Sequence, residues 1–259
     1  MENSYKVIIM DVDGTLTNSE KIVTPKTKEA LIKAEEKGIK LILASGRPTS
    51  GLVDLGKELE MDRYHGLFVC YNGSKVVDCQ TMETLFNQPL SVAEGKAVLE
   101  HMKKFDRVRP MIDKGEYMYV TNVYDNYINF NGKPFNVFEY ESRGGKYKLC
   151  EVDDLAKFAD FEINKILTTS DPEYLQANYH WMKAKALDAV LKPMGYKQEE
   201  MIAFGDGQND ASMVKYAGLG VAMANAVDEL KEISQYITGS NDEDGIADAL
   251  YKFIPELND

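Results

Sequence analysis

Short, fully apolar runs recur along the chain, and each ends at a polar or glycine-containing turn. The runs are Val7 to Met10, Leu41 to Ala44, Leu67 to Cys70 and Met201 to Phe204. Apolar runs without alternation are typical of parallel strands that are buried on both faces. We therefore predict strands over these four segments, and shorter strands over Val221 to Met223 and Tyr236 to Thr238.

Helical patterns lie between these runs. The first predicted helix follows residue 24, because Thr24 can cap it, Pro25 suits its first position and Gly38 suits the site just past its end. Its apolar residues Ala30, Leu31 and Ala34 recur at helical spacing. Further helices are predicted from Thr49 to Leu59, from Ser91 to Phe105 and from Lys183 to Leu191.

The order of these elements predicts an α/β fold with a doubly wound parallel, Rossmann-like sheet. The pattern changes after about residue 84, and residues 111–150, rich in Tyr, Phe, Asn and Gly, are predicted to form strands and loops. Near residue 183 the first pattern returns. We therefore expect a catalytic core of residues 1–84 and 180–259, with a smaller inserted α+β domain of residues 85–179.

Composition narrows the classes of partner. The chain has 259 residues and a formal net charge of -12, and such an acidic protein repels nucleic-acid backbones. Its three cysteines lack metal-type spacing, and their odd number suits a reducing compartment. No signal-peptide layout precedes the first apolar run, which is too short to span a membrane. We expect a cytoplasmic protein, monomeric or weakly dimeric, that binds neither nucleic acid nor membrane.

Acidic residues follow two of the predicted strands. Asp11 and Asp13 are two positions apart, so in an extended segment their side chains point the same way, and their mutual repulsion calls for a cation or a shared proton. Asp206 and Asp210 follow the strand at 201–204. Ligands of parallel sheets bind at the carboxyl ends of strands, and clustered carboxylates there suit Mg²⁺. Taken alone, each pair is also compatible with a solvated acidic loop.

Two weaker signals lie elsewhere. Ser45 and Gly46 follow a predicted strand, where a hydroxyl and backbone amides can hold phosphate oxygens, although ordinary turn chemistry explains them equally well. Lys183 and Lys185 lie on a predicted helix, where a lysine is usually solvated.

Together these segments resemble the haloacid dehalogenase superfamily of phosphohydrolases. Asp11 to Thr15 matches its Asp-x-Asp-Gly-Thr motif, Ser45 its second motif, and Gly205 to Asp210 its Gly-Asp-Gly-x-Asn-Asp motif. The lysine motif is matched by residues 183–187, in the register that selects Lys183. The resemblance covers about residues 5–80 and 183–255.

Within that superfamily the chain is similar to the Cof-type group, which carries an αβ (type IIB) cap. The similarity rests on four segments: Ser45 to Pro48, Tyr71 to Gly73, Gly220 to Ala226 and Asn241 to Ala247. The stretch before Lys183 is shorter than is usual for the group. The resemblance therefore implies a shortened cap.

The resemblance implies a magnesium-dependent phosphomonoester hydrolase of small phosphorylated metabolites. Sugar phosphates are the leading candidate substrates, followed by pyridoxal phosphate and flavin mononucleotide. It implies that Asp11 attacks phosphorus to form an aspartyl-phosphate, and that Asp13 is the general acid and base. Lys183 would assist catalysis by stabilising the phosphoryl oxygens as charge shifts.

The remaining roles also follow from the resemblance. Mg²⁺ would be held by the carboxylates of Asp11 and Asp206 and by the backbone carbonyl of Asp13. The groups that would hold phosphate or substrate are Ser45, Gly46, Asn209 and Arg47, the last of which could instead only fix its loop. Asp210 and Asn72 would orient these groups without touching the substrate themselves.

Three other functions fit parts of the same pattern. A phosphomutase or phosphotransferase could use the same core. A response-regulator receiver also gathers acidic residues and a lysine on a parallel sheet, but is normally about half this length and has no inserted domain. A non-catalytic phospho-ligand-binding protein is the third.

Overall fold

The structure is a computed structural model, and it describes residues 5–103, 108–124, 127–130, 133–169 and 195–258. Its internal contacts divide the chain into two compact units. The core unit combines Met1–Phe86 with His180–Asp259, and the inserted unit is Asn87–Tyr179.

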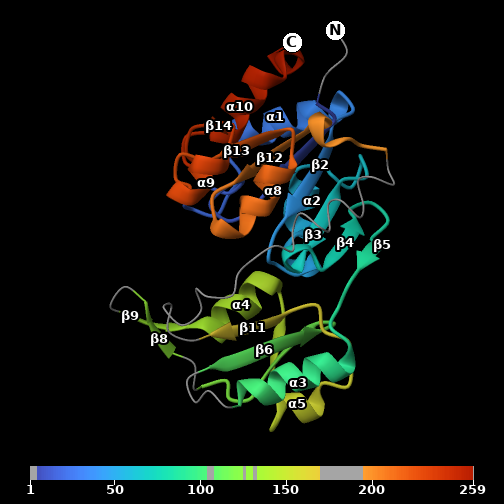
Figure 1. Cartoon of the computed structure of the whole chain (residues 1–259), viewed down its shortest axis with the longest axis vertical. Coiled ribbons are helices and arrows are strands. Elements are labelled where there is room, and N and C mark those ends of the chain that lie inside the picture. Colours follow the sequence, from blue (N-terminus) through green and yellow to red (C-terminus); the bar gives the residue numbers. More distant parts are fainter. Residues whose placement is uncertain (1–4, 104–107, 125–126, 131–132, 170–194, 259) are drawn as a thin grey trace. The chain divides into compact units, whose positions relative to one another are not determined.

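The principal sheet has eight strands among the described residues, in the order β14-β13-β12-β1-β2-β3-β4-β5 (Figure 1). These strands are β1 (Val7–Met10), β2 (Lys40–Ala44), β3 (Leu67–Cys70), β4 (Lys75–Asp78), β5 (Thr84–Asn87), β12 (Met201–Gly205), β13 (Leu219–Ala222) and β14 (Tyr236–Ile237). All neighbours from β14 to β3 pair in parallel, and β4 runs antiparallel to β3. The four main predicted strands and the α/β fold class are confirmed.

Helices and short 3-10 turns connect these strands or follow the last of them. They are α1 (Pro25–Glu36), η1 (Thr49–Gly51), α2 (Val53–Glu58), η2 (Tyr71–Gly73), η4 (Gln198–Glu200), η5 (Gln208–Asp210), α8 (Ala211–Tyr216), α9 (Asp228–Ile233), α10 (Gly245–Phe253) and η6 (Pro255–Asn258). The helix predicted over residues 49–59 is in place but interrupted at Leu52. The helix predicted from Lys183 to Leu191 lies outside the described residues.

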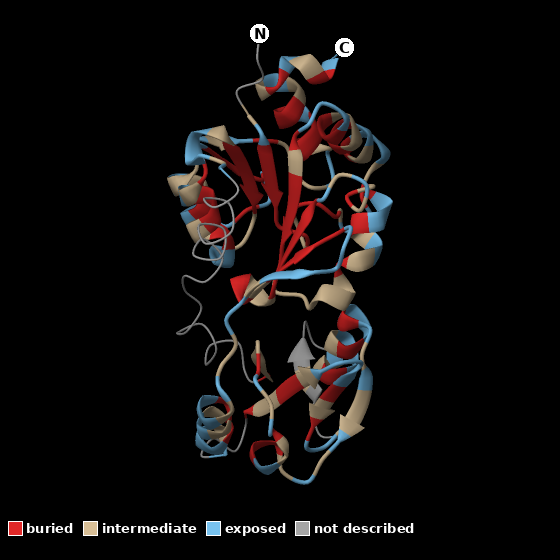
Figure 2. Ribbon diagram, turned by 90° about the vertical axis from the view of Figure 1, so that its right-hand side faces the viewer, coloured by how far each residue is buried: buried red, intermediate tan, exposed pale blue. Residues whose placement is uncertain are grey.

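Strands β1, β2, β3, β12 and β13 are buried on both faces, as the red strands of Figure 2 show. Ile8 and Met10 pack in one apolar layer with residues of α1 and α10. Val7 and Ile9 pack in the opposite layer, which includes Met213 of α8. This two-sided burial is the physical reason why the strands are continuous apolar runs.

Helix α1 has the ends that its sequence predicts. The Thr24 hydroxyl accepts a hydrogen bond from the Thr27 N–H at 3.4 Å, and Pro25 is the first helical residue. Past the end, Gly38 takes a φ of +83°, a left-handed conformation that favours glycine.

The inserted unit has a four-stranded sheet in the order β10-β7-β6-β11 and a separate β8-β9 hairpin. Its strands are β6 (Arg109–Lys114), β7 (Tyr117–Val120), β8 (Tyr127–Phe130), β9 (Lys133–Asn136), β10 (Lys148–Glu151) and β11 (Ile166–Thr169), and its helices are α3 (Val92–Met102), α4 (Val137–Gly145) and α5 (Leu155–Phe158). Leu99 of α3 and Leu155 of α5 share one apolar cluster, while Phe138 of α4 belongs to another. The unit is therefore α+β.

Helix α4 corrects the prediction that residues 111–150 hold only strands and loops. The Asn136 side chain caps it by accepting a hydrogen bond from the Glu139 N–H at 3.1 Å. Phe138, Ser142 and Gly145 are its buried residues, at helical spacing. Two of these three are not hydrophobic, so the sequence shows no apolar stripe there.

Among the described helices, none has both the length and the apolar character needed to cross a membrane. Cys70, Cys79 and Cys150 are free thiols.

Candidate active site

Three carboxylates converge at the carboxyl ends of two adjacent strands. Asp11 follows β1 and Asp206 follows β12, and these strands pair with Met10 opposite Phe204. One carboxylate oxygen from each of Asp11, Asp206 and Asp210 lies within 4.8 Å of the other two. Asp11 and Asp210 are buried.

Asp210 shapes the turn that carries Asp206. Its Oδ2 accepts hydrogen bonds from the N–H groups of Asp206 at 3.1 Å and Gly207 at 3.0 Å, and its Oδ1 accepts one from Asn209 Nδ2 at 3.2 Å. Gly205 permits this close packing, since a Cβ there would lie 2.5 Å from Cβ of Asp210. Asp210 thus both supports the Asp206 loop and belongs to the cluster.

The loop after β1 packs directly against Asp206. Gly14 has a φ of +83°, and a Cβ at this position would lie 2.4 Å from Asp206 Oδ2. Thr15 Oγ1 donates a hydrogen bond to Asp206 Oδ1 at 2.9 Å. Asp206 is therefore oriented from two sides, by Thr15 and by its own turn.

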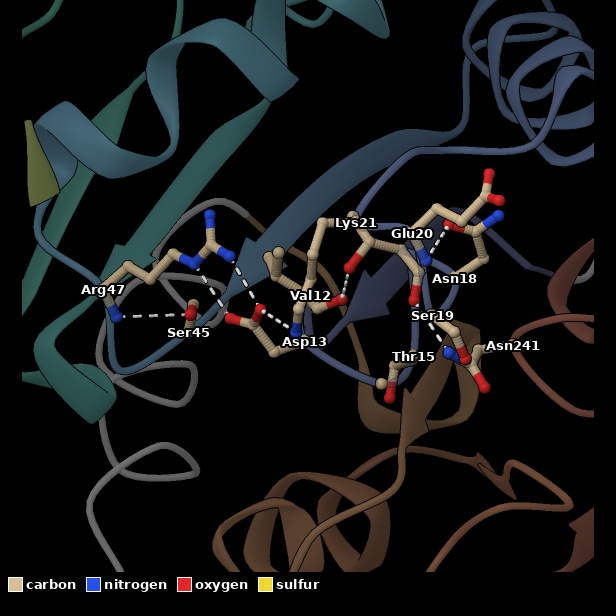
Figure 3. A network of polar contacts seen from close by, with 12 residues as sticks. Val12, Asp13, Thr15, Asn18, Ser19, Glu20, Lys21, Ser45, Arg47 and Asn241 are labelled. Atoms are coloured by element: carbon tan, nitrogen blue, oxygen red, sulfur yellow. Dashed lines mark hydrogen bonds and ion pairs between the residues drawn. The ribbon is translucent and has the colours of Figure 1, made fainter. Parts of the chain in front are cut away.

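Asp13 is held by two cations. Arg47, in the loop after β2, donates from Nε to Asp13 Oδ2 at 2.8 Å and from Nη2 to Asp13 Oδ1 at 2.7 Å (Figure 3). Lys21 Nζ lies 3.0 Å from Asp13 Oδ1. Burial raises the pKa of the Asp13 carboxyl, but the hydrogen bonds and charge of Arg47, followed by those of Lys21, outweigh it and bring the pKa below its usual 3.8.

Ser45 lies at the end of β2 and is buried. Its hydroxyl oxygen accepts a hydrogen bond from the Arg47 N–H at 3.2 Å, and its carbonyl accepts one from the Asn72 N–H at 3.0 Å. Asn72 has a left-handed backbone, with φ of 55°. The loops after β2 and β3 are thereby joined.

Two of the remaining predicted site residues lie in the loops of this site. Gly46 lies between Ser45 and Arg47 in this loop, and Asn209 is exposed beside the acidic cluster. Lys183 lies outside the described residues.

The donor set fits a divalent cation. Three carboxylates this close repel one another unless a cation or protons intervene, and oxygen ligands are those that Mg²⁺ prefers. The cluster can therefore bind a metal.

Sequence reasoning missed Lys21 and the hydroxyl of Thr15. Lys21 reaches Asp13 only because the chain between residues 18 and 22 turns sharply: Asn18 Oδ1 accepts from the N–H groups of Glu20 at 3.0 Å and Ile22 at 3.1 Å, and Lys21 takes a φ of 63°. Asn at the first position of a tight turn was an available signal. Thr15 was matched to a motif but given no role.

Comparisons with known proteins point to one family of hydrolases. A family model described as haloacid dehalogenase-like hydrolase matches residues 8–182 and 177–250. The chain is 31% identical over 257 residues to the 5-amino-6-(5-phospho-D-ribitylamino)uracil phosphatase YcsE of Bacillus subtilis (strain 168), covering 96% of each chain. It is 27% identical over 277 residues to the pyridoxal phosphate phosphatase YbhA of Escherichia coli (strain K12), covering 96% of this chain and 98% of the other.

Among solved structures, a haloacid dehalogenase-like hydrolase from Bacteroides thetaiotaomicron superimposes with a TM-score of 0.80 at 32% identity. The match covers 96% of this chain and 99% of that one.

Proposed function

The chain belongs to the haloacid dehalogenase-like hydrolases and is a phosphatase of that family, and we propose that it hydrolyses phosphate monoesters of small metabolites. In this proposal the reaction requires Mg²⁺ and passes through an aspartyl-phosphate intermediate on Asp11. The observation that carries the proposal is the convergence of Asp11, Asp206 and Asp210. A nucleophilic carboxylate beside a cation site is what attack on an anionic phosphate requires.

Asp11 is the nucleophile in this proposal. It is buried at the end of β1, and its N–H donates to the Phe204 carbonyl at 3.1 Å, so its backbone is fixed to the neighbouring strand. Such anchoring restrains the attacking oxygen and lowers the entropic cost of reaching phosphorus. Attack forms a bond from carboxylate oxygen to phosphorus as the leaving oxygen departs.

Asp13 is the general acid and then the general base. With Arg47 and Lys21 on its carboxylate it holds no proton at neutral pH, which is the form that takes a proton from the hydrolytic water. An arriving phosphate anion would compete for Arg47, and loss of that pair would raise the pKa of Asp13. Asp13 would then take up a proton from water and pass it to the leaving oxygen.

Mg²⁺ would be held by the carboxylates of Asp11 and Asp206, with the Asp13 backbone carbonyl as a third ligand and Asp210 close beside them. Bound there, it would supply positive charge that offsets the repulsion between the nucleophile and phosphate. Ser45, Gly46, Asn209 and Lys183 are proposed to hold the phosphoryl oxygens.

The proposed substrates are phosphorylated sugars and polyols. Support comes from the relative that is 31% identical, whose named substrate, 5-amino-6-(5-phospho-D-ribitylamino)uracil, carries its phosphate on a polyol chain. Pyridoxal phosphate is the second candidate, because it is the named substrate of the relative at 27% identity. The cytoplasmic location and the monomeric or weakly dimeric state stay predictions.

The test is a phosphate-release screen of sugar phosphates, polyol phosphates, pyridoxal phosphate and p-nitrophenyl phosphate, with Mg²⁺ and with EDTA. We expect turnover that requires Mg²⁺ and is abolished in Asp11→Asn, which keeps the shape of the side chain and removes its charge. Product analysis accompanies the screen, since an isomerised sugar phosphate without free phosphate would identify a phosphomutase.

Full activity of Asp11→Asn would refute the nucleophile. Equal activity in EDTA would refute the role of the metal. Activity restricted to pyridoxal phosphate would reverse the order of the substrate classes.

A further inference from the structure

The loop that follows the nucleophile depends on two remote asparagines for part of its hydrogen bonding. Inside the loop, the Leu16 N–H donates to the Asp11 carbonyl at 3.3 Å and the Thr17 N–H donates to the Val12 carbonyl at 3.0 Å. The carbonyls of Gly14 and Thr17 accept hydrogen bonds from side chains outside the loop. Asn225 Nδ2 donates to Gly14 at 2.7 Å, and Asn241 Nδ2 donates to Thr17 at 3.0 Å.

The two asparagines are also bonded to each other. The Asn241 N–H donates to Asn225 Oδ1 at 3.0 Å. A backbone N–H can only donate and a carbonyl can only accept, so these two contacts define which end of the Asn225 amide is oxygen and which is nitrogen. Asn225 is therefore oriented by its own partners, and it connects residue 241 to residue 14.

Neighbouring contacts join the same three segments. The Ala224 N–H donates to the Gly239 carbonyl at 3.2 Å. Asp242 accepts hydrogen bonds from Ser19, at 2.7 Å from its N–H and 2.6 Å from its hydroxyl. Figure 3 shows Asn241 beside the loop that carries Thr15 and Ser19.

The position of the Gly14 carbonyl matters for the acidic cluster. The peptide between Gly14 and Thr15 is planar, so a bond that fixes the carbonyl also restricts the orientation of the whole unit. On one side of this peptide Gly14 packs against Asp206, and on the other Thr15 donates to Asp206. A rotation of the peptide would therefore disturb the orientation of Asp206.

We propose that Asn225 and Asn241 are positioning residues of the active centre, which hold the 13–17 loop against Asp206 and so maintain the carboxylate cluster. The inference rests on the proposed function for its kinetic consequences. Neither side chain touches substrate in this role, and the effect passes through the backbone of Gly14 and Thr17.

The variants are Asn225→Ala, Asn241→Ala and Asn225→Asp. The last keeps the acceptor for the Asn241 N–H but replaces the donor with a charged oxygen that repels the Gly14 carbonyl. The matched control is Asn258→Ala, because Asn258 Nδ2 likewise donates to backbone carbonyls, those of Tyr251 at 3.0 Å and Pro255 at 3.1 Å, at the far end of the chain.

We expect kcat to fall about tenfold in each of the three variants, as for loss of one hydrogen bond that holds a catalytic loop. The Mg²⁺ concentration for half-maximal activity should rise several-fold, while KM for p-nitrophenyl phosphate changes little. Asn258→Ala should keep the wild-type kcat and Mg²⁺ dependence even where its melting temperature falls. Folded Asn225 and Asn241 variants with wild-type kcat and Mg²⁺ dependence would overturn the proposal.

Two readouts separate this proposal from the proposed function. Amide hydrogen exchange should quicken at residues 14–18 in Asn225→Ala and not in Asn258→Ala, and calorimetry should show weaker Mg²⁺ binding. If the wild-type protein releases no phosphate from any substrate, the proposed function fails while these readouts still test the loop. Unchanged exchange in that loop would refute the positioning role whatever the activity.

Discussion

Arg47 binds the carboxylate of Asp13 through two hydrogen bonds of nearly equal length, from Nε at 2.8 Å and from Nη2 at 2.7 Å. This fork-on-carboxylate geometry is the strong form of the ion pair. It joins the loops after β1 and β2, and it holds Asp13 as an anion.

Removal of Arg47 should raise the pKa of Asp13. The pair with Arg47 offsets the upward effect of burial on that pKa, so in Arg47→Ala burial and the weaker contact with Lys21 remain. Carboxyl carbon NMR, assigned with Asp13→Asn, should show Asp13 titrating at higher pH than in the wild type. Lys21→Ala should move it in the same direction by less, and an unchanged titration in Arg47→Ala would contradict the assignment.

Gly14→Ala should impair metal binding as well as stability. The φ of +83° costs about 1–2 kcal/mol for a side chain, and the added Cβ would strike Asp206 Oδ2. Gly38→Ala is the matched control, because Gly38 has the same φ but no atom lies within 4 Å of its Cβ position. Both variants should unfold at a lower denaturant concentration than the wild type. Only Gly14→Ala should need more Mg²⁺ than the wild type for activity. Equal Mg²⁺ dependence of the two variants would show that the contact with Asp206 is unimportant.

Thr15→Val should weaken the metal site without removing a ligand. The hydroxyl orients Asp206 through the 2.9 Å hydrogen bond, and loss of such an orienting bond typically costs 10–100-fold in metal affinity. Isothermal calorimetry with Mg²⁺ measures the change. Thr15→Ser keeps the hydroxyl and should retain most of the affinity. Wild-type affinity in Thr15→Val, which keeps the methyl group and lacks the hydroxyl, would show that the hydrogen bond to Asp206 is unimportant.

Glu35 should make stability depend on pH. It is buried, and neither of its carboxylate oxygens has a hydrogen-bond partner among the described residues. Burial, followed by the charge of Glu60, raises the pKa of Glu35 from 4.5 to about 8. The folded state therefore binds the proton more tightly than the unfolded state, so the stabilisation is complete below about pH 4.5 and is lost as pH rises through about 8.

Chemical denaturation between pH 5 and 8 tests this effect. The wild-type free energy of unfolding should fall over that range by up to about 4 kcal/mol from this group alone, and the fall should be smaller in Glu35→Leu. Glu36→Gln is the control, since Glu36 is adjacent but exposed. Parallel curves for wild type and Glu35→Leu would refute the prediction.

The sequence was most informative where structure is decided by neighbours along the chain. Apolar runs located β1, β2, β3 and β12, and Thr24, Pro25 and Gly38 located the ends of α1. Helix α4 escaped prediction because its buried face includes Ser142 and Gly145, which carry no hydrophobic signal.

The same division holds for the site. The sequence alone determined that Asp11 and Asp206 follow buried strands, because strand periodicity and the polar residues at strand ends are local properties of the chain. Only the tertiary structure decided that Arg47 and Lys21 meet on Asp13, that Asp210 joins the carboxylate cluster, and that Asn225 binds the Gly14 carbonyl. Those contacts depend on which strands are neighbours in the sheet and on left-handed residues that aim individual loops, and both are settled by packing between segments as distant as residues 14 and 225.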